Sequence, residues 1–288
     1  MQSDTYIRDI STLRITDAEP AGGKGANMGE MVAARLPVPP GFVLLRDCYR
    51  DSMRAGGVDA ELSALHREAL AHVADTTRLA EMCERMQGLV HKAGVVDVVR
   101  DLILDAYHVL GAHSVVAVRS SATGEDGRDA SFAGMNATIT NVSGDEGLVD
   151  AVLRCWMSLF SLRVITYRAS RDFTADPAMA VVVQQMVNSE KAGVAFTADP
   201  STGGQDRVVI EGAFGLGEVV VSGEVEPDTC IASKETLETL DIRLGHKAFK
   251  IVRGPDGHDK PVDLDDAQAD ARVLGDDELR LIANLGAA

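Results

Sequence analysis

VAVRSSAT, residues Val116–Thr123, is an apolar run that ends in one arginine and a group of hydroxyl residues. The run predicts a buried strand. Sheets usually bind ligands at the ends of their strands, and the guanidinium of Arg119 matches phosphate geometry. An ion pair between Arg119 and Glu125 or Asp126 explains the same residues equally well. The segment therefore predicts a strand and leaves two roles open for its arginine.

Two glycine-containing segments lie on either side of this strand. Upstream, Gly22-Gly23-Lys24-Gly25 combines close backbone approach with a mobile positive charge, which suits a triphosphate. It lacks the spacing of a P-loop, and a solvated turn with a surface lysine is the alternative. Downstream, Ser131–Asn136 has the small residues of a loop that folds over phosphates, or of a tight hairpin turn.

Two further motifs follow in the second half of the chain. Val183-Gln184-Gln185-Met186-Val187 ends an apolar strand with two amides that suit a base edge, although a strand leaving the core would look the same. Gly212–Glu218 contains three glycines, which indicate a close backbone approach or an unusual turn. Glu211 and Glu218 are weak candidates for binding a hard cation such as Mg²⁺.

Composition excludes several classes of protein. The 288 residues carry 28 Lys and Arg against 44 Asp and Glu, a net charge of −16. This charge argues against a broad nucleic-acid interface and against an anionic membrane surface. With 45% hydrophobic residues the chain can bury a sizeable core. The four cysteines form no C-x-x-C pair, and no signal peptide or 18-residue apolar stretch is visible, so we expect buried thiols and a cytoplasmic protein.

The order of helical and strand-like patterns predicts an α+β fold. Helices dominate before about residue 175 and strands after it, so we expect subdomains at 1–175 and 176–288. Asp145–Tyr167 has the pattern of one long helix, and Pro255–Ala271 reads as an acidic loop.

Taken together, the motifs resemble a known family. VAVRSSATGEDGRDASFAGMNATITNV, VVVQQMV, GVAFTADPSTGG and GAFGLGEVVVSGEVEPDT occur in the family's order, preceded by GGKGANMGEM and LPVPPGF. They resemble the N-terminal nucleotide-binding domain shared by phosphoenolpyruvate synthase, pyruvate phosphate dikinase and rifampin phosphotransferase. The resemblance covers nearly the whole chain.

The resemblance implies an ATP-grasp-like fold, with ATP and Mg²⁺ in a cleft between two α+β subdomains. It implies that Lys24 and Arg119 hold phosphates and that Gly134 and Thr138 lie in a lid loop. It also implies that Gln185 contacts the adenine, with Met186 and Val187 lining it. The family reaction transfers a phosphoryl group from ATP to a histidine and then to pyruvate.

Two departures from the family pattern limit this expectation. An Asp-Ile-Glu-Trp segment and a Gln-x-Arg-Pro strand, which bind metal and phosphates in the family, are absent before Ala288. None of the seven histidines lies in the family's Thr-Ser-His-Ala-like context. We therefore expect at most the ATP half-reaction. A swivelling histidine domain and an acceptor domain would come from another chain or from a longer one, and an unpaired strand edge would favour homo-oligomers. A rifampin-phosphotransferase-like kinase component and a non-catalytic nucleotide-binding module are the alternatives.

Overall fold

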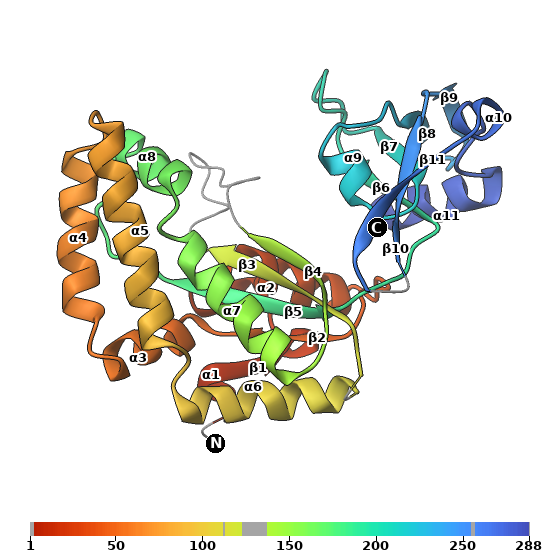
Figure 1. The fold of residues 1–288 in the computed structure, drawn as a ribbon. Coiled ribbons are helices and arrows are strands. Elements are labelled where there is room, and N and C mark those ends of the chain that lie inside the picture. The colour runs from red at the N-terminus through yellow and green to blue at the C-terminus, as the bar shows by residue number, and fades with distance from the viewer. Residues whose placement is uncertain (1–2, 112, 123–136, 255–256, 288) are drawn as a thin grey trace. The chain divides into compact units, whose positions relative to one another are not determined.

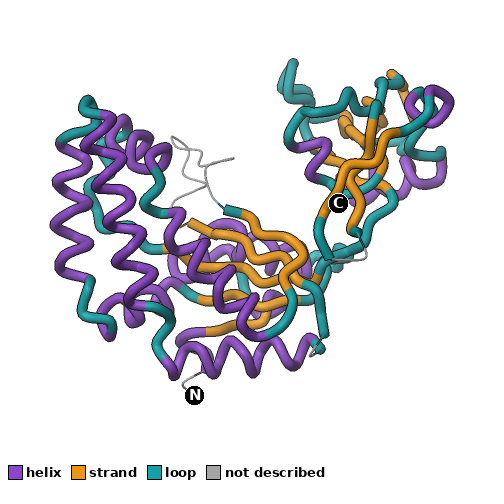
Figure 2. Tube along the Cα trace, viewed as in Figure 1, coloured by secondary structure: helices purple, strands orange, loops and turns teal. Residues whose placement is uncertain are grey.

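The structure is a computed structural model that describes residues 3–111, 113–122, 137–254 and 257–287. The chain forms two compact units, Met1–Met186 and Val187–Ala288. Both combine helices with antiparallel sheets, which confirms the predicted α+β class (Figure 2). Within the described residues, no helix combines the length and the apolarity needed to cross a membrane.

The first unit is built on a five-stranded antiparallel sheet of order β1-β2-β5-β3-β4. Its elements are α1 (Ser3–Tyr6), β1 (Ile7–Asp9), the 3-10 turns η1 (Ile10–Thr12) and η2 (Ile15–Asp17), α2 (Ala18–Ala33), β2 (Gly41–Leu44), α3 (Arg46–Ala55), α4 (Asp59–Ala71), α5 (Thr76–Ala93), α6 (Asp97–Leu110), β3 (Val116–Ala122), β4 (Thr138–Val142), α7 (Asp145–Ser158), α8 (Leu162–Ser170) and β5 (Met179–Gln185).

Helices cover both faces of this sheet. Helix α7 crosses one face and α2 lies against the other (Figure 1). Alternate residues of β5 separate the two layers, because successive strand side chains point to opposite faces. Val181 and Val183 belong to the large core beneath α3, α5 and α7, whereas Ala180 and Val182 pack in a smaller cluster beneath α2.

The second unit has a four-stranded antiparallel sheet of order β6-β7-β8-β9 and a separate hairpin, β10-β11. Its elements are β6 (Lys191–Phe196), β7 (Arg207–Phe214), α9 (Glu218–Val221), β8 (Asp228–Ser233), β9 (Thr239–Arg243), β10 (Phe249–Arg253), β11 (Asp259–Asp263), α10 (Asp266–Ala269) and α11 (Asp276–Ala287). Helix α11 packs Leu279 and Ala283 onto Val208, Ile210 and Cys230 of the sheet.

Two predictions of secondary structure are wrong. The expected single helix over Asp145–Tyr167 is two helices, because the chain leaves helical geometry and Ser161 caps α8 by accepting a hydrogen bond from the Val164 amide at 3.3 Å. The segment Pro255–Ala271, expected to be a loop, contains β11 and α10. Its charged sequence lacks the apolar pattern of a strand, and β11 forms because it pairs with β10.

The boundary between the two compact units differs from the boundary near residue 175 that the helix and strand patterns predicted. Strand β5 follows residue 175 in the sequence, yet it is the central strand of the first unit's sheet. The first compact unit ends at Met186, and the second begins at Val187. A functional division at residue 175 stays a prediction.

His66 of α4 is a buried titratable group in the helical layer of the first unit. Its ring is fully buried beside Phe160, and its Nδ1 lies 3.9 Å from a carboxylate oxygen of Asp176. Burial, with smaller contributions from the nearby Arg168 and Arg67 and against the opposing effect of Asp176, lowers the pKa of His66 to about 4. The folded protein therefore holds this ring neutral over a range in which the unfolded chain protonates it.

We expect His66 to make the first unit sensitive to acid. The pKa of His66 is lower in the folded state than its ordinary value of 6.5. The contribution of this residue to the free energy of unfolding is therefore fully present above pH 6.5 and is lost as the pH falls towards 4. Between pH 7.5 and 5 this residue alone should remove about 2 kcal/mol from the free energy of unfolding. Urea unfolding followed by Trp156 fluorescence measures it. An equal pH dependence in wild type and His66→Leu would contradict the assignment.

Candidate functional site

Helix α2 is broken at Gly22, within the first glycine motif. Gly22 has φ 70° and ψ 163°, and the helix resumes after it. A Cβ added at Gly22 would lie 2.3 Å from the carbonyl oxygen of Ser121 on β3. Only glycine combines this left-handed φ with so close an approach. Lys24 therefore lies in the first turn of the resumed helix, where the helix dipole favours an anion.

The hydroxyl of Ser121 connects this break to strand β3. Its Oγ donates to the carbonyl oxygen of Ala21 at 2.9 Å and accepts from the amide of Gly25 at 3.2 Å. Ser121 is completely buried. The structure thus brings together two motifs that are 96 residues apart in the sequence, the glycine segment and the arginine-bearing strand.

Arg119 lies on the same side of β3 as this contact. In the antiparallel register Arg119 faces Val182 of β5 and Ser121 faces Ala180, and both partners belong to the cluster beneath α2. Arg119 also faces Thr138, the exposed first residue of β4. The two expected phosphate residues therefore come from segments that the Ser121 contact joins: Lys24 lies in α2 and Arg119 in the middle of β3. Thr138, expected in a lid loop, is instead the first residue of strand β4. Gly134 lies outside the described residues.

The two glutamines at the end of β5 have different environments. Gln184 is buried on the α2 side, and its Nε2 donates to the carbonyl oxygen of Pro39 at 3.1 Å. Gln185 is exposed, and its backbone amide donates to the carbonyl oxygen of Pro40 at 2.9 Å. Gln184 therefore fits the alternative of a strand that simply leaves the core, because its side chain is used within the fold. The side chain of Gln185 is accessible to a ligand.

Met186 and Val187 lie where the chain passes from the first unit to the second. The Met186 amide donates to the carbonyl oxygen of Val115 at 2.8 Å, which keeps the end of β5 beside the start of β3. Met186 is half-buried and Val187 is 59% exposed. The exposed apolar side chain of Val187 is available to pack against an aromatic ring of a ligand.

The glycine motif of the second unit forms a tight structural turn. Gly215 has φ 85°, its amide donates to the carbonyl oxygen of Glu190 at 2.7 Å, and an added Cβ would lie 2.3 Å from the Ile251 carbonyl oxygen. This confirms the predicted close backbone approach. Glu211 lies within β7 and Glu218 begins α9.

No residues of the described chain form a metal cage. Among them there is no group of three or more His, Cys, Asp or Glu side chains that could hold a metal ion. Mg²⁺ in phosphate-transfer sites needs only one or two carboxylates, with phosphates and water as its other ligands. Glu211 and Glu218 therefore stay weak candidates.

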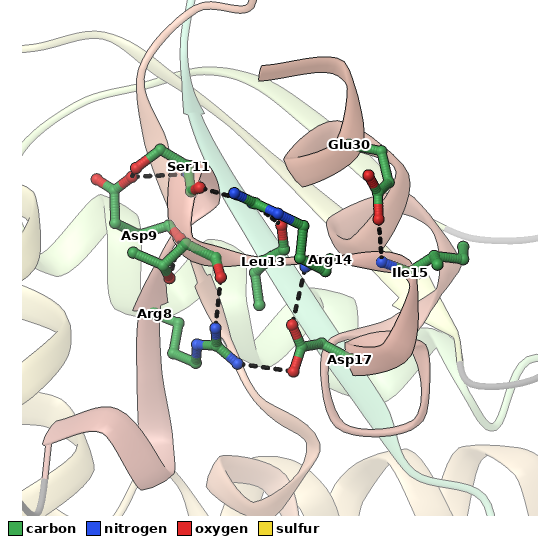
Figure 3. Close-up of polar contacts among 9 residues, drawn as sticks. Arg8, Asp9, Ser11, Leu13, Arg14, Ile15, Asp17 and Glu30 are labelled. Carbon is green, nitrogen blue, oxygen red and sulfur yellow. Dashed lines mark hydrogen bonds and ion pairs between the residues drawn. The ribbon is translucent and has the colours of Figure 1, made fainter. Parts of the chain in front are cut away.

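A polar cluster that the sequence reasoning missed holds the residues just before α2 and ties the C-terminal part of α2 to them (Figure 3). Arg8 pairs with Asp17 at 2.8 Å, and the Glu30 carboxylate accepts from the Ile15 amide at 2.7 Å. Gly29 lets the helix approach the 3-10 turns, because an added Cβ would lie 2.2 Å from the Leu13 carbonyl oxygen. The charges of residues 8–17 alternate in sign as they do on ordinary polar surfaces, so the sequence did not indicate these pairings.

The cysteines do not contribute a nucleophile. All four are buried and free, as predicted: Cys48, Cys83, Cys155 and Cys230. Burial raises the pKa of Cys48 and of Cys155 to about 12. A separate pocket of about 240 Å³ between α3 and α4 contains none of the predicted site residues.

Comparisons with known proteins give the same family as the order of the sequence motifs. The family model described as "Pyruvate phosphate dikinase, AMP/ATP-binding domain" matches residues 18–288. A probable phosphoenolpyruvate synthase of Methanocaldococcus jannaschii is 42% identical over 98% of this chain and 24% of its own length. A probable phosphoenolpyruvate synthase of Methanothermobacter thermautotrophicus is 41% identical over 98% of this chain and 41% of its own length.

A third relative gives the same result. The phosphoenolpyruvate synthase of Deinococcus radiodurans is 37% identical over 96% of this chain and 37% of its own length. The chain thus spans from 24% to 41% of the length of these three relatives.

Proposed function

Because the chain belongs to the family of pyruvate phosphate dikinase AMP/ATP-binding domains, we propose that its first unit binds the phosphates of ATP with Lys24 and Arg119. The observation that carries this proposal is the Ser121 contact. It joins the glycine segment next to Lys24 to the strand that bears Arg119. Two cationic side chains from distant segments, Lys24 at the resumed start of α2 and Arg119 on the α2 side of β3, would then flank the phosphates, beside a helix start whose dipole favours anions.

The adenine would lie beyond the phosphates along β5. Gln185 is three residues past Val182, the register partner of Arg119, so about 10 Å separates them along the strand. The side chain of Gln185 is on the opposite side of the sheet from Arg119, so it would contact the base from the exposed end of β5, where Met186 and Val187 would line the ring. Thr138 and the lid loop that includes Gly134 would close over the phosphates. The ATP-grasp-like cleft between two subdomains is part of this proposal and rests on the family resemblance.

The chemistry of the domain would be charge neutralisation and positioning. This domain would form no bond to the transferred phosphoryl group, which passes to the histidine of a partner domain, so cations held around the phosphates would supply most of its share of the catalysis. Lys24 and Arg119 would neutralise and orient the phosphate oxygens. When bound with ATP, Mg²⁺ would offset further negative charge, and Glu211 and Glu218 are only weak candidates for holding it.

The reaction of the whole enzyme is a second step of the proposal. We infer that the domain serves a phosphoenolpyruvate synthase-like enzyme, in which ATP, pyruvate and water give phosphoenolpyruvate, AMP and phosphate. Three relatives that are known or probable phosphoenolpyruvate synthases align with nearly all of this chain, and this similarity supports the inference. The domain would activate ATP, and a histidine domain and a pyruvate site would be its partners.

Replacing Arg119 tests the phosphate assignment. We expect Arg119→Ala to weaken MgATP binding about tenfold or more, because a charge-assisted hydrogen bond is worth about 1.5–3 kcal/mol. Isothermal calorimetry on the full chain measures the affinity. Arg100→Ala is the matched control, since Arg100 is on the surface of α6 and pairs with Glu146 at 2.6 Å. Equal MgATP affinities for wild type and Arg119→Ala would contradict the assignment.

A further inference from the structure

The hydroxyl of Ser121 occupies an unusual position relative to helix α2. An unbroken α-helix would join the carbonyl oxygen of Ala21 to the amide of Gly25, four residues later. Gly22, which lies between them, has dihedral angles outside the helical range. Ser121 Oγ contacts both groups, donating to one at 2.9 Å and accepting from the other at 3.2 Å. The hydroxyl is thus inserted into the helical hydrogen-bond ladder at its break.

These contacts are made in a buried environment. Ala21, Gly25 and Ser121 are all buried, so the two backbone groups have poor access to water. Burying a backbone polar group without a partner costs free energy comparable to a lost hydrogen bond. The serine hydroxyl is both donor and acceptor, and can satisfy the two groups at once. An alanine at this position would fill the space of the Cβ and satisfy neither.

The break determines where Lys24 is placed. Lys24 precedes Gly25, whose amide Ser121 holds, and follows the break at Gly22 by two residues. The C-terminal part of α2 is fixed independently, because Glu30 accepts from the Ile15 amide and Gly29 abuts Leu13. Ser121 therefore acts on the end of α2 that carries the lysine.

We propose that Ser121 is a positioning residue for ATP binding, which holds the break in α2 and thereby aims Lys24 at the phosphates. This inference rests on the proposed function, since Lys24 is the phosphate ligand through which Ser121 acts. Ser121 itself needs no contact with the nucleotide.

The first measurement compares single variants of the full chain by calorimetry with MgATP. We expect Ser121→Ala to lower the affinity between about three- and tenfold, and Lys24→Ala to lower it about tenfold. Ser120→Ala is the matched control. Ser120 is the neighbouring buried serine of β3, and its hydroxyl donates to the Ala137 carbonyl oxygen at 3.0 Å instead of contacting α2. Its MgATP affinity should stay within about twofold of wild type.

A double-mutant cycle separates positioning from general loss of structure. If Ser121 acts through Lys24, then Ser121→Ala should cost little once Lys24 is already alanine. The double variant should bind MgATP within about twofold of Lys24→Ala alone. Full additivity of the two losses would overturn the proposal, because Ser121 would then act by another route.

Hydrogen exchange provides a readout that does not depend on ATP. In the free protein, Ser121→Ala should speed amide exchange in a peptide covering Gly23–Met28, while a peptide from α7 should exchange as in wild type. Unchanged exchange at Gly23–Met28 would overturn the proposal. Failure of the wild-type chain to bind MgATP would overturn the proposed function and, with it, this role. Normal wild-type binding with an equal affinity in Ser121→Ala would overturn the positioning role alone.

Discussion

Replacing Lys247 by methionine is expected to lower the free energy of unfolding of the second unit by about 3–5 kcal/mol. Lys247 is fully buried, and its Nζ donates to Asp228 at 2.5 Å and to the Gly245 carbonyl oxygen at 2.9 Å. The ammonium also lies 5.9 Å from the centroid of the Phe214 ring. Methionine keeps most of the volume but leaves the buried Asp228 carboxylate without its cation.

Asp228 makes this pair the junction of three segments. Besides Lys247, its carboxylate accepts from the amide of Gly245 at 3.0 Å and from the amide of Val273 at 2.7 Å. These bonds join the start of β8 to the turn before β10 and to the segment that leads into α11. Loss of the cation should therefore loosen the docking of α11 on the sheet.

The measurement must report on the second unit alone. Residues 187–288 contain no tryptophan or tyrosine, but they contain one cysteine, Cys230, which is 2% exposed on β8. The rate of thiol labelling at Cys230, followed by peptide mass spectrometry, reports opening of this unit, while Trp156 fluorescence reports the first. We expect Lys247→Met to speed labelling at Cys230 and to leave the Trp156 transition unchanged.

Two further variants test the physical cause. Lys191→Met removes a cation from the same unit, but Lys191 and Glu278 form a surface pair at 2.8 Å, so the cost should be at most about 1 kcal/mol. Adding Asp228→Asn to Lys247→Met should recover part of the loss, because the amide carries no charge and still accepts a hydrogen bond. A cost for Lys247→Met no larger than that for Lys191→Met would contradict the argument.

This buried pair shows why part of the fold could not be predicted from the sequence. Lys247 and Asp228 are 19 residues apart, and each alone has the pattern of an ordinary surface charge. Only the folded arrangement of three segments removes both from water. By contrast, the apolar runs of β3, β5 and β7 mark buried strands directly, because a strand covered on both faces needs apolar side chains on both.

The candidate site divides in the same way. The glycine segment and the arginine-bearing strand could each be recognised locally, but each also had a structural alternative, which for the glycine segment was the stronger of the two. The family resemblance assigned Lys24 and Arg119, and the structure supplied the Ser121 contact between their segments. Strand register also distinguished Gln184 from Gln185, since adjacent residues of a strand face opposite sides of the sheet. Neither relation is visible in a linear sequence.

Replacing Gly22 by alanine should disrupt the first unit and its ATP site together. The left-handed φ of 70° costs a non-glycine residue about 1–2 kcal/mol. The added Cβ would also overlap the Ser121 carbonyl oxygen at 2.3 Å and its carbonyl carbon at 2.6 Å, which forces α2 away from β3. Such overpacking adds about 1–3 kcal/mol. We expect Gly22→Ala to lower the free energy of unfolding by at least about 2 kcal/mol and MgATP affinity by more than about tenfold.

Gly88→Ala is the matched control for this substitution. Gly88 lies inside α5, and an added Cβ there would have no atom within 4 Å. Alanine at an open helical position should raise the free energy of unfolding by about 0.5–1 kcal/mol. Urea unfolding followed by Trp156 fluorescence compares the two variants in one unit, and calorimetry gives their MgATP affinities. If Gly22→Ala were as stable as Gly88→Ala and bound MgATP like wild type, α2 would have to run unbroken through Gly22, and the contact that joins Lys24 to the arginine-bearing strand would be wrong.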